Sequence, residues 1–143
     1  MLVGITGNIA SGKSEVAHFF EKAGYVVYDA DVLAHELYDT DSALLAQIYE
    51  SFGPGVKNSD GSLNRKELGQ IVFADAHQLK KLNALVHPKL LQYIHFKVFK
   101  AQSEKIVLDA ALLIEWEVQE YFDSFIVVTC DTDMRCKRLM ERN

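Results

Sequence analysis

The sequence has little cysteine and proline, and it lacks both a long apolar run and a cluster of basic residues. Its 143 residues include two cysteines and two prolines. Two cysteines, Cys130 and Cys136, do not suggest a disulfide framework or a zinc site, and a reducing, cytoplasmic setting is the natural inference. No apolar stretch approaches the about 20 residues that a membrane-spanning helix needs. No lysine or arginine run resembles a nucleic-acid footprint. We therefore expect no membrane or nucleic-acid partner.

The remaining composition is typical of a folded domain. Hydrophobic residues make up 49% and charged residues 24%, with a formal net charge of −5. A chain of this length can bury roughly two-thirds of its unfolded surface, so a hydrophobic core is possible. The apolar N-terminal run has no basic segment before it, and we expect no signal peptide.

The most informative feature is the segment from Gly7 to Ser14, which reads GNIASGKS. It matches the phosphate-binding pattern G-x-x-x-x-G-K-[ST], and it lies between an apolar strand-like run and an amphipathic helix. In that context backbone N–H groups and the helix dipole face a phosphate chain. Lys13 would reach the β- and γ-phosphates, and the Ser14 hydroxyl would ligate Mg²⁺. The residues expected to bind nucleotide are Ala10, Ser11, Gly12, Lys13, Ser14 and Glu15. Because Ala10 is not glycine, we expect a negative φ there.

The order of elements predicts an α/β fold with a parallel sheet. Strand-like runs at residues 1–6, 24–28, 105–108 and 125–129 alternate with helical stretches. Between the second and third strands lies a long region of helical periodicity, in which Pro88 is expected to interrupt the helix. We predict a P-loop NTPase-like core from residues 1–39 and 104–143, with an inserted helical, acceptor-binding subdomain at 40–103.

Acidic residues follow the predicted strands at the edge where ligands bind in such sheets. Asp29 and Asp31 follow the second strand, and Asp109 follows the third. A carboxylate there can hold a metal through water or accept a proton from an attacking hydroxyl. A lone aspartate at a strand end can equally be a helix cap or a turn residue. Asp31 emerges at the same edge as the phosphate loop, which favours the catalytic interpretation.

Taken as a set, these segments resemble the dephospho-CoA kinase family. The resemblance runs through the whole chain, in order, on the segments GITGNIASGKSEVA, YDADVLAHEL, SFG, DGSLNRKEL, VF, LNALVHPKL, LDAALLIE and RLMER. It implies a P-loop kinase that transfers the γ-phosphate of ATP to the ribose 3′-hydroxyl of dephospho-CoA, the last step of coenzyme A synthesis. It also implies Mg²⁺ as cofactor, and ATP and dephospho-CoA as substrates.

The resemblance also implies roles for individual residues. Asp31 matches the general base, and Lys13 matches the phosphate lysine. Arg65 and His87 match acceptor-side motifs. Arg138 and Arg142 match arginines that lead into the lid. Other interpretations remain open: Arg65 as a surface arginine, His87 as part of a helix-breaking His-Pro turn, and the two arginines as a solvated helix end near its C-terminal dipole.

The chain departs from the family pattern at Asn8, Ala10, Glu15, Ala111 and Arg135, where Gly, Gly, Thr, Pro and Gln are usual or common. The family also continues past Asn143 with lid helices, a further strand and a final helix. On that basis we expect the 143-residue chain to bind ATP weakly, to turn over slowly or not at all, and to self-associate.

Alternative functions remain at this stage. The chain could be another P-loop kinase for a nucleotide or small metabolite, or an ATP-binding module without activity. A GTPase switch would normally show a base-reading N-K-x-D stretch, which does not occur here. A large helical insert is explained by an acceptor pocket and not by a switch. The sequence does not indicate an oligomeric state.

Overall fold

A computed structural model describes residues 1–99 and 105–142 and divides the chain into two compact units. One unit, the sheet unit, comprises Met1–Asp31 and Lys100–Asn143, and the other, the helical unit, comprises Val32–Phe99. The predicted insert began at residue 40, whereas the helical unit begins at Val32, inside a helix. The helical unit therefore includes most of the helix that follows the second strand.

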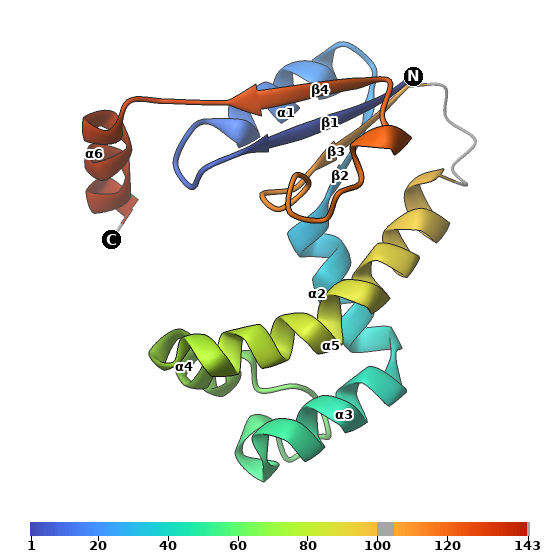
Figure 1. Ribbon diagram of the computed structural model, residues 1–143, viewed down its shortest axis with the longest axis vertical. Coiled ribbons are helices and arrows are strands. Elements are labelled where there is room, and N and C mark those ends of the chain that lie inside the picture. The colour runs from blue at the N-terminus through green and yellow to red at the C-terminus, as the bar shows by residue number, and fades with distance from the viewer. Residues whose placement is uncertain (100–104, 143) are drawn as a thin grey trace. The chain divides into compact units, whose positions relative to one another are not determined.

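The sheet unit contains four parallel strands, which are labelled in Figure 1. They are β1 (Leu2–Gly7), β2 (Val26–Asp29), β3 (Ile106–Asp109) and β4 (Ser124–Val128), in the order β2-β3-β1-β4. The predicted parallel α/β architecture is confirmed. Because the strands are parallel, their carboxyl ends meet at one edge of the sheet, where the register pairs Asp29 with Asp109 and Gly7 with Val128.

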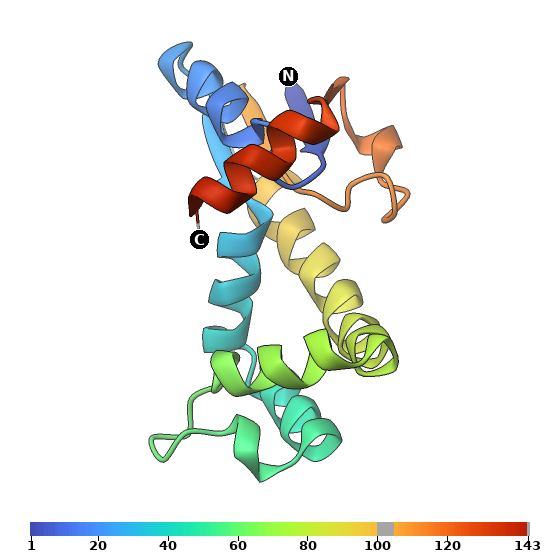
Figure 2. The ribbon, with the colours of Figure 1, turned by 90° about the vertical axis from the view of Figure 1, so that its left-hand side faces the viewer.

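Alternating side chains of β1 pack on the two faces of this sheet. Val3 and Ile5 are buried against Ala17 of helix α1 (Lys13–Lys22) and against Val107 of β3. On the opposite face Gly4 lies under an aromatic ring, because a Cβ atom at Gly4 would come within 2.7 Å of the Phe125 ring. Figure 2 shows α1 (blue) on one side of the strands and the segment around residues 110–123 (orange) on the other.

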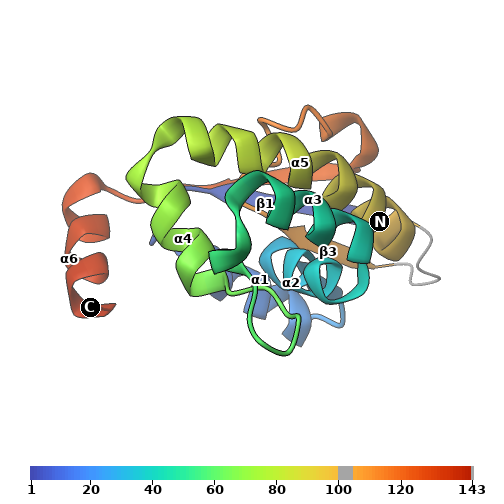
Figure 3. The ribbon, with the colours of Figure 1, turned by 90° about the horizontal axis from the view of Figure 1, so that it is seen from below.

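The helical unit is formed by helices that begin at side-chain caps. Helix α3 (Ser42–Phe52) begins after Asp41, and helix α4 (Arg65–Ala74) begins after Asn64. Their side-chain oxygens accept hydrogen bonds from backbone N–H groups of the first turn, at 2.9 Å and 3.1 Å. Such caps satisfy donors that the helix itself leaves free. Helix α2 (Ala30–Thr40), the short 3₁₀ turn η1 (Pro54–Val56) and helix α5 (Ala76–Ile94) complete the unit, and Figure 3 looks onto α3, α4 and α5.

The prediction that Pro88 interrupts a helix is wrong. Helix α5 runs without a break from Ala76 to Ile94 and contains Pro88 in its interior, followed by a π-helical turn, η2 (His95–Phe99). A proline inside a helix costs about 3 kcal/mol because it removes a backbone hydrogen bond. Burying one large aliphatic side chain contributes about 1.5–3 kcal/mol. The apolar stripe that continues on both sides of the proline therefore outweighs its cost; it consists of Leu82, Val86, Leu90 and Ile94, all buried.

The last part of the sheet unit contains the 3₁₀ turn η3 (Gln119–Tyr121) and helix α6 (Thr132–Arg142). Both cysteines are free thiols, Cys130 before α6 and Cys136 within it. Of the helices in the described part of the chain, none combines the length and the apolar character that crossing a lipid bilayer requires.

Candidate functional site

The phosphate loop joins β1 to α1 and is shaped by two glycines. Gly7 has a φ of 150°, and a Cβ atom there would lie 2.2 Å from the Val128 carbonyl oxygen. Gly12 immediately precedes α1 with a φ of 107°, in the left-handed region. Both positions require glycine because of their positive φ, and Gly7 also because the Val128 backbone leaves no room for a Cβ atom. The Ser11 N–H donates to the Asn8 carbonyl at 3.1 Å and closes the turn between them.

The prediction of a negative φ at Ala10 is wrong. Ala10 has a φ of 61°, in the left-handed region that disfavours residues with a Cβ atom. A backbone that alternates between right- and left-handed residues turns successive N–H groups toward one anion. The geometry of the loop therefore overrides the local preference of alanine, at a cost of about 1–2 kcal/mol.

Three carboxylates lie where β2 and β3 end. Asp29 closes β2 and Asp109 closes β3, and the two are register partners. Asp31 lies in the first turn of α2, and its N–H donates to the Asp29 carboxylate at 2.7 Å. This contact caps the helix start and holds Asp31 in place. Asp29 was predicted only as a strand-end carboxylate; its capping contact is what the sequence did not reveal.

Asp109 is the most perturbed of these acids. Its Oδ1 atom is buried and has no hydrogen-bond partner among the described residues. Burial raises the pKa of Asp109, the positive charge of Lys13 opposes that rise, and the negative charges of Asp29 and Asp31 add to it. A desolvated carboxylate facing a lysine beside a phosphate loop is typical of a functional site.

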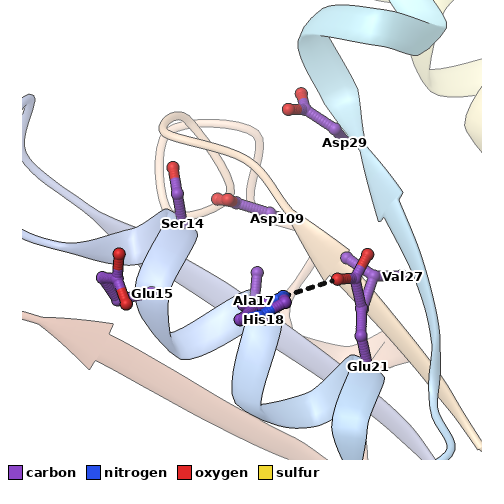
Figure 4. A pocket seen from close by; sticks show the side chains of 8 residues that line it. All are labelled: Ser14, Glu15, Ala17, His18, Glu21, Val27, Asp29 and Asp109. Carbon is purple, nitrogen blue, oxygen red and sulfur yellow. Dashed lines mark hydrogen bonds and ion pairs between the residues drawn. The ribbon is translucent and has the colours of Figure 1, made fainter.

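Beside the loop is an open cavity of about 400 Å³. Figure 4 shows the Ser14 and Asp109 side chains near each other, with Asp29 above them at the end of β2. His18 and Glu21 of α1 line the same cavity and contact each other at 3.1 Å, and the complete lining is Ser14, Glu15, Ala17, His18, Glu21, Val27, Asp29 and Asp109. The cavity is thus acidic, which suits a bound cation more than a bare anion.

Two arginines of α6 reach the phosphate loop from its outer side. Arg138 was predicted near the phosphates, and its Nη1 donates to the Ala10 carbonyl at 3.1 Å. Arg135 was not predicted as a site residue, yet its Nε donates to the Ile9 carbonyl at 3.2 Å. Sequence spacing alone could place both arginines on one helix face, but not that face against the loop. The side chain of Arg142 lies outside the described part of the structure.

The two predicted acceptor-side residues belong to the helical unit. Arg65 begins α4 and donates to the Asp39 carboxylate at 3.2 Å and to the His35 carbonyl at 3.5 Å, both on α2. His87 is half-buried in α5, and burial lowers its pKa. Arg65 thus ties two helices of its unit together, and the roles of both residues toward an acceptor stay predictions.

The described residues contain no group of three or more His, Cys, Asp and Glu side chains placed to hold a metal ion. Mg²⁺ does not need such a group, since it is commonly held by one or two protein oxygens together with substrate phosphates and water. The loop, its lysine and the strand-end carboxylates can bind a phosphate chain, neutralise its charge and accept a proton beside it.

Comparison with known proteins separates this arrangement from other P-loop proteins. The family model CoaE, described as dephospho-CoA kinase, matches residues 1–143. The chain belongs to the dephospho-CoA kinase family. It is 38% identical over 146 aligned residues to the dephospho-CoA kinase of Bacillus licheniformis, covering all of this chain and 73% of that protein. It is 36% identical to the Listeria monocytogenes enzyme of the same name, covering 99% of this chain and 72% of that one.

Two solved structures share this fold. A Thermus thermophilus protein superposes with a TM-score of 0.79 at 31% identity, covering all of this chain and 72% of the other. The dephospho-CoA kinase from Campylobacter jejuni superposes with a TM-score of 0.62 at 19% identity, covering 99% of this chain and 96% of the other, and supports the fold alone. The family model and the curated relatives confirm the family expected from the sequence motifs.

Proposed function

We propose that this member of the dephospho-CoA kinase family transfers the γ-phosphoryl group of ATP to the ribose 3′-hydroxyl of dephospho-CoA, in the cytoplasm. The observation that carries the proposal is the meeting of a phosphate loop with three carboxylates at one sheet edge. The two free thiols are consistent with a reducing compartment.

The phosphate loop supplies binding and charge neutralisation. Backbone N–H groups of residues 10–15 and the N-terminus of α1 surround the phosphates. Lys13, the first residue of α1, neutralises charge that develops on the transferred group. Because such transfer involves little covalent chemistry by the protein, positioning and electrostatics account for most of the catalysis.

Asp31 is the proposed general base. It is exposed in the first turn of α2, in the same unit as the loop, and Asp29 fixes its backbone. As the 3′-oxygen of the acceptor bonds to the γ-phosphorus, the bond from the γ-phosphorus to the oxygen that links it to the β-phosphorus breaks. ADP departs with that oxygen. The proton of the hydroxyl goes to the Asp31 carboxylate, which must be ionised beforehand.

Mg²⁺ is the proposed cofactor, and the residues present are suited to it. The Ser14 hydroxyl would ligate the ion, and Asp109 would hold one of its water ligands. The buried, unpartnered Oδ1 of Asp109 is the observation that supports this assignment. When bound, Mg²⁺ neutralises negative charge on the phosphates. The positive charge of Mg²⁺ would also offset the cost of keeping the buried Asp109 carboxylate ionised.

The acceptor and lid roles rest on position in the family motifs. We propose that Arg65 and His87 of the helical unit contact dephospho-CoA, and that Arg138 and Arg142 contact phosphate oxygens. Arg65 reaches Asp39 and His35, so it is held in one place before any substrate arrives. An arginine fixed in this way loses less entropy when it binds a phosphate.

A thermal-shift titration tests the substrate assignment. Mg·ATP and dephospho-CoA should each raise the melting temperature, because both bind the native state alone. GTP at the same concentrations should raise it less. A response to ATP without one to dephospho-CoA would favour the alternative of another P-loop kinase or an ATP-binding module.

A further inference from the structure

The apex of the phosphate loop receives two hydrogen bonds from α6. Arg135 Nε donates to the Ile9 carbonyl at 3.2 Å, and Arg138 Nη1 donates to the Ala10 carbonyl at 3.1 Å. The two arginines are three residues apart, so they lie on the same helix face. Two consecutive carbonyls on the outside of the loop are therefore bound from one side.

Apart from the hydrogen bond from the Ser11 N–H to the Asn8 carbonyl, this apex has little else to hold its shape. The Ile9 side chain is 62% exposed, so hydrophobic packing contributes little there. Ala10 adopts a φ of 61°, a conformation that an alanine leaves readily unless its surroundings maintain it. Binding the outward carbonyls also fixes the inward direction of the following N–H groups, since each peptide unit is planar.

We propose that Arg135 is a positioning residue for ATP: it holds the Ile9–Ala10 segment in the anion-binding conformation before the nucleotide arrives. The inference rests on the proposed function of the loop. Arg135 is half-buried, whereas Arg138 is exposed and also lies 3.8 Å from the Cys130 sulfur. Arg138 can therefore leave the loop to meet a phosphate, and Arg135 remains as the fixed support.

Hydrogen exchange on the nucleotide-free protein tests this support directly. In Arg135→Ala, amides of residues 10–14 should exchange about three to ten times faster than in the wild type, while the rest of α1 keeps its protection. The control is Lys137→Ala, which removes an exposed positive charge from the same helix. Unchanged exchange of the loop in Arg135→Ala would overturn the proposal, whatever the protein binds.

Calorimetric titration with Mg·ATP provides the second measurement. Arg135→Ala should weaken ATP affinity by about three- to tenfold, the effect of one hydrogen bond from a charged donor. KM for ATP should rise by a similar factor, and kcat should change less. Lys137→Ala should leave both unchanged. A fall in kcat with unchanged KM and affinity would contradict a positioning role.

Adding Ala10→Gly to Arg135→Ala separates positioning from simple charge attraction. Glycine adopts positive φ without strain, so the loop should depend less on Arg135 when residue 10 is glycine. The double variant should therefore bind ATP almost as tightly as Ala10→Gly alone. If Arg135 acts only through its charge, the glycine restores nothing. If the wild type itself fails to bind ATP, the proposed function fails, and the hydrogen-exchange result still decides the role of Arg135.

Discussion

Asp29 and Asp109 are paired in register as the last residues of two neighbouring parallel strands. Paired residues point to the same face of a sheet, and neighbouring strands are about 4.8 Å apart. Two carboxylates thus end neighbouring strands at the same edge of the sheet, and Asp109 also carries a desolvated oxygen. The charge of Lys13 offsets this only in part, because the pKa of Asp109 remains raised overall. Ionising Asp109 therefore costs free energy, and a cation bound beside it would lower that cost.

The first prediction concerns Asp109 and pH. Its raised pKa means that the native state binds more protons than the unfolded state between the ordinary pKa of aspartate and the raised value. Stability should therefore fall as pH rises through that window. The stability of Asp109→Asn should not fall with pH in this window, and this variant should melt at a higher temperature than the wild type at neutral pH. Its kcat should fall at least about tenfold. Thermal melts across pH with parallel assays check this; a lower melting temperature at neutral pH would contradict it.

The second prediction concerns Asp31. Asparagine keeps the shape of the side chain but cannot take up the proton, so Asp31→Asn should lower kcat by about 10²–10⁴-fold. ATP affinity should change by less than about threefold, because the carboxylate is assigned to the attacking hydroxyl. Glu50→Gln, an exposed acid of the helical unit, serves as the control. Equal losses in ATP binding and turnover would make Asp31 a metal or structural residue instead.

The third prediction concerns Pro88, an exposed residue inside α5. Pro88→Ala restores an N–H that can donate to the Ala84 carbonyl one turn earlier. The new hydrogen bond stabilises the helix, and the greater conformational entropy of the unfolded chain without proline offsets part of that effect. The free energy of unfolding should rise by about 1–2 kcal/mol. Urea denaturation measures it, with Lys80→Ala of the same helix as the control. An unchanged or lower midpoint would mean that the helix has already adapted to the proline.

Much of the fold could be predicted because its signals are local. The phosphate loop and the alternating strands and helices depend on residues near one another in sequence. The parallel sheet followed from that alternation. The prediction at Pro88 failed because the burial that sustains α5 depends on the whole stripe from Leu82 to Ile94.

The site was predictable only where a motif fixes it. Lys13 and Ser14 follow from the loop pattern, and Asp31 from its place after β2. The capping of Asp31 by Asp29 and the contact of Arg135 with Ile9 are tertiary or turn geometry that spacing does not encode. The conformation of Ala10 was missed for the same reason, since the requirement to surround an anion overrides the preference of one residue.

The most direct test of the central claim is to identify the product that the protein forms from Mg·ATP and dephospho-CoA. However slow its turnover, the wild type should form ADP and CoA in equal amounts, with the new phosphate on the ribose 3′-oxygen by ³¹P NMR. Lys13→Ala should lower that rate by about 10²–10³-fold at an unchanged melting temperature, and Lys22→Ala, at the other end of α1, should not. ATP hydrolysis without transfer, or transfer that does not depend on Lys13, would contradict the account.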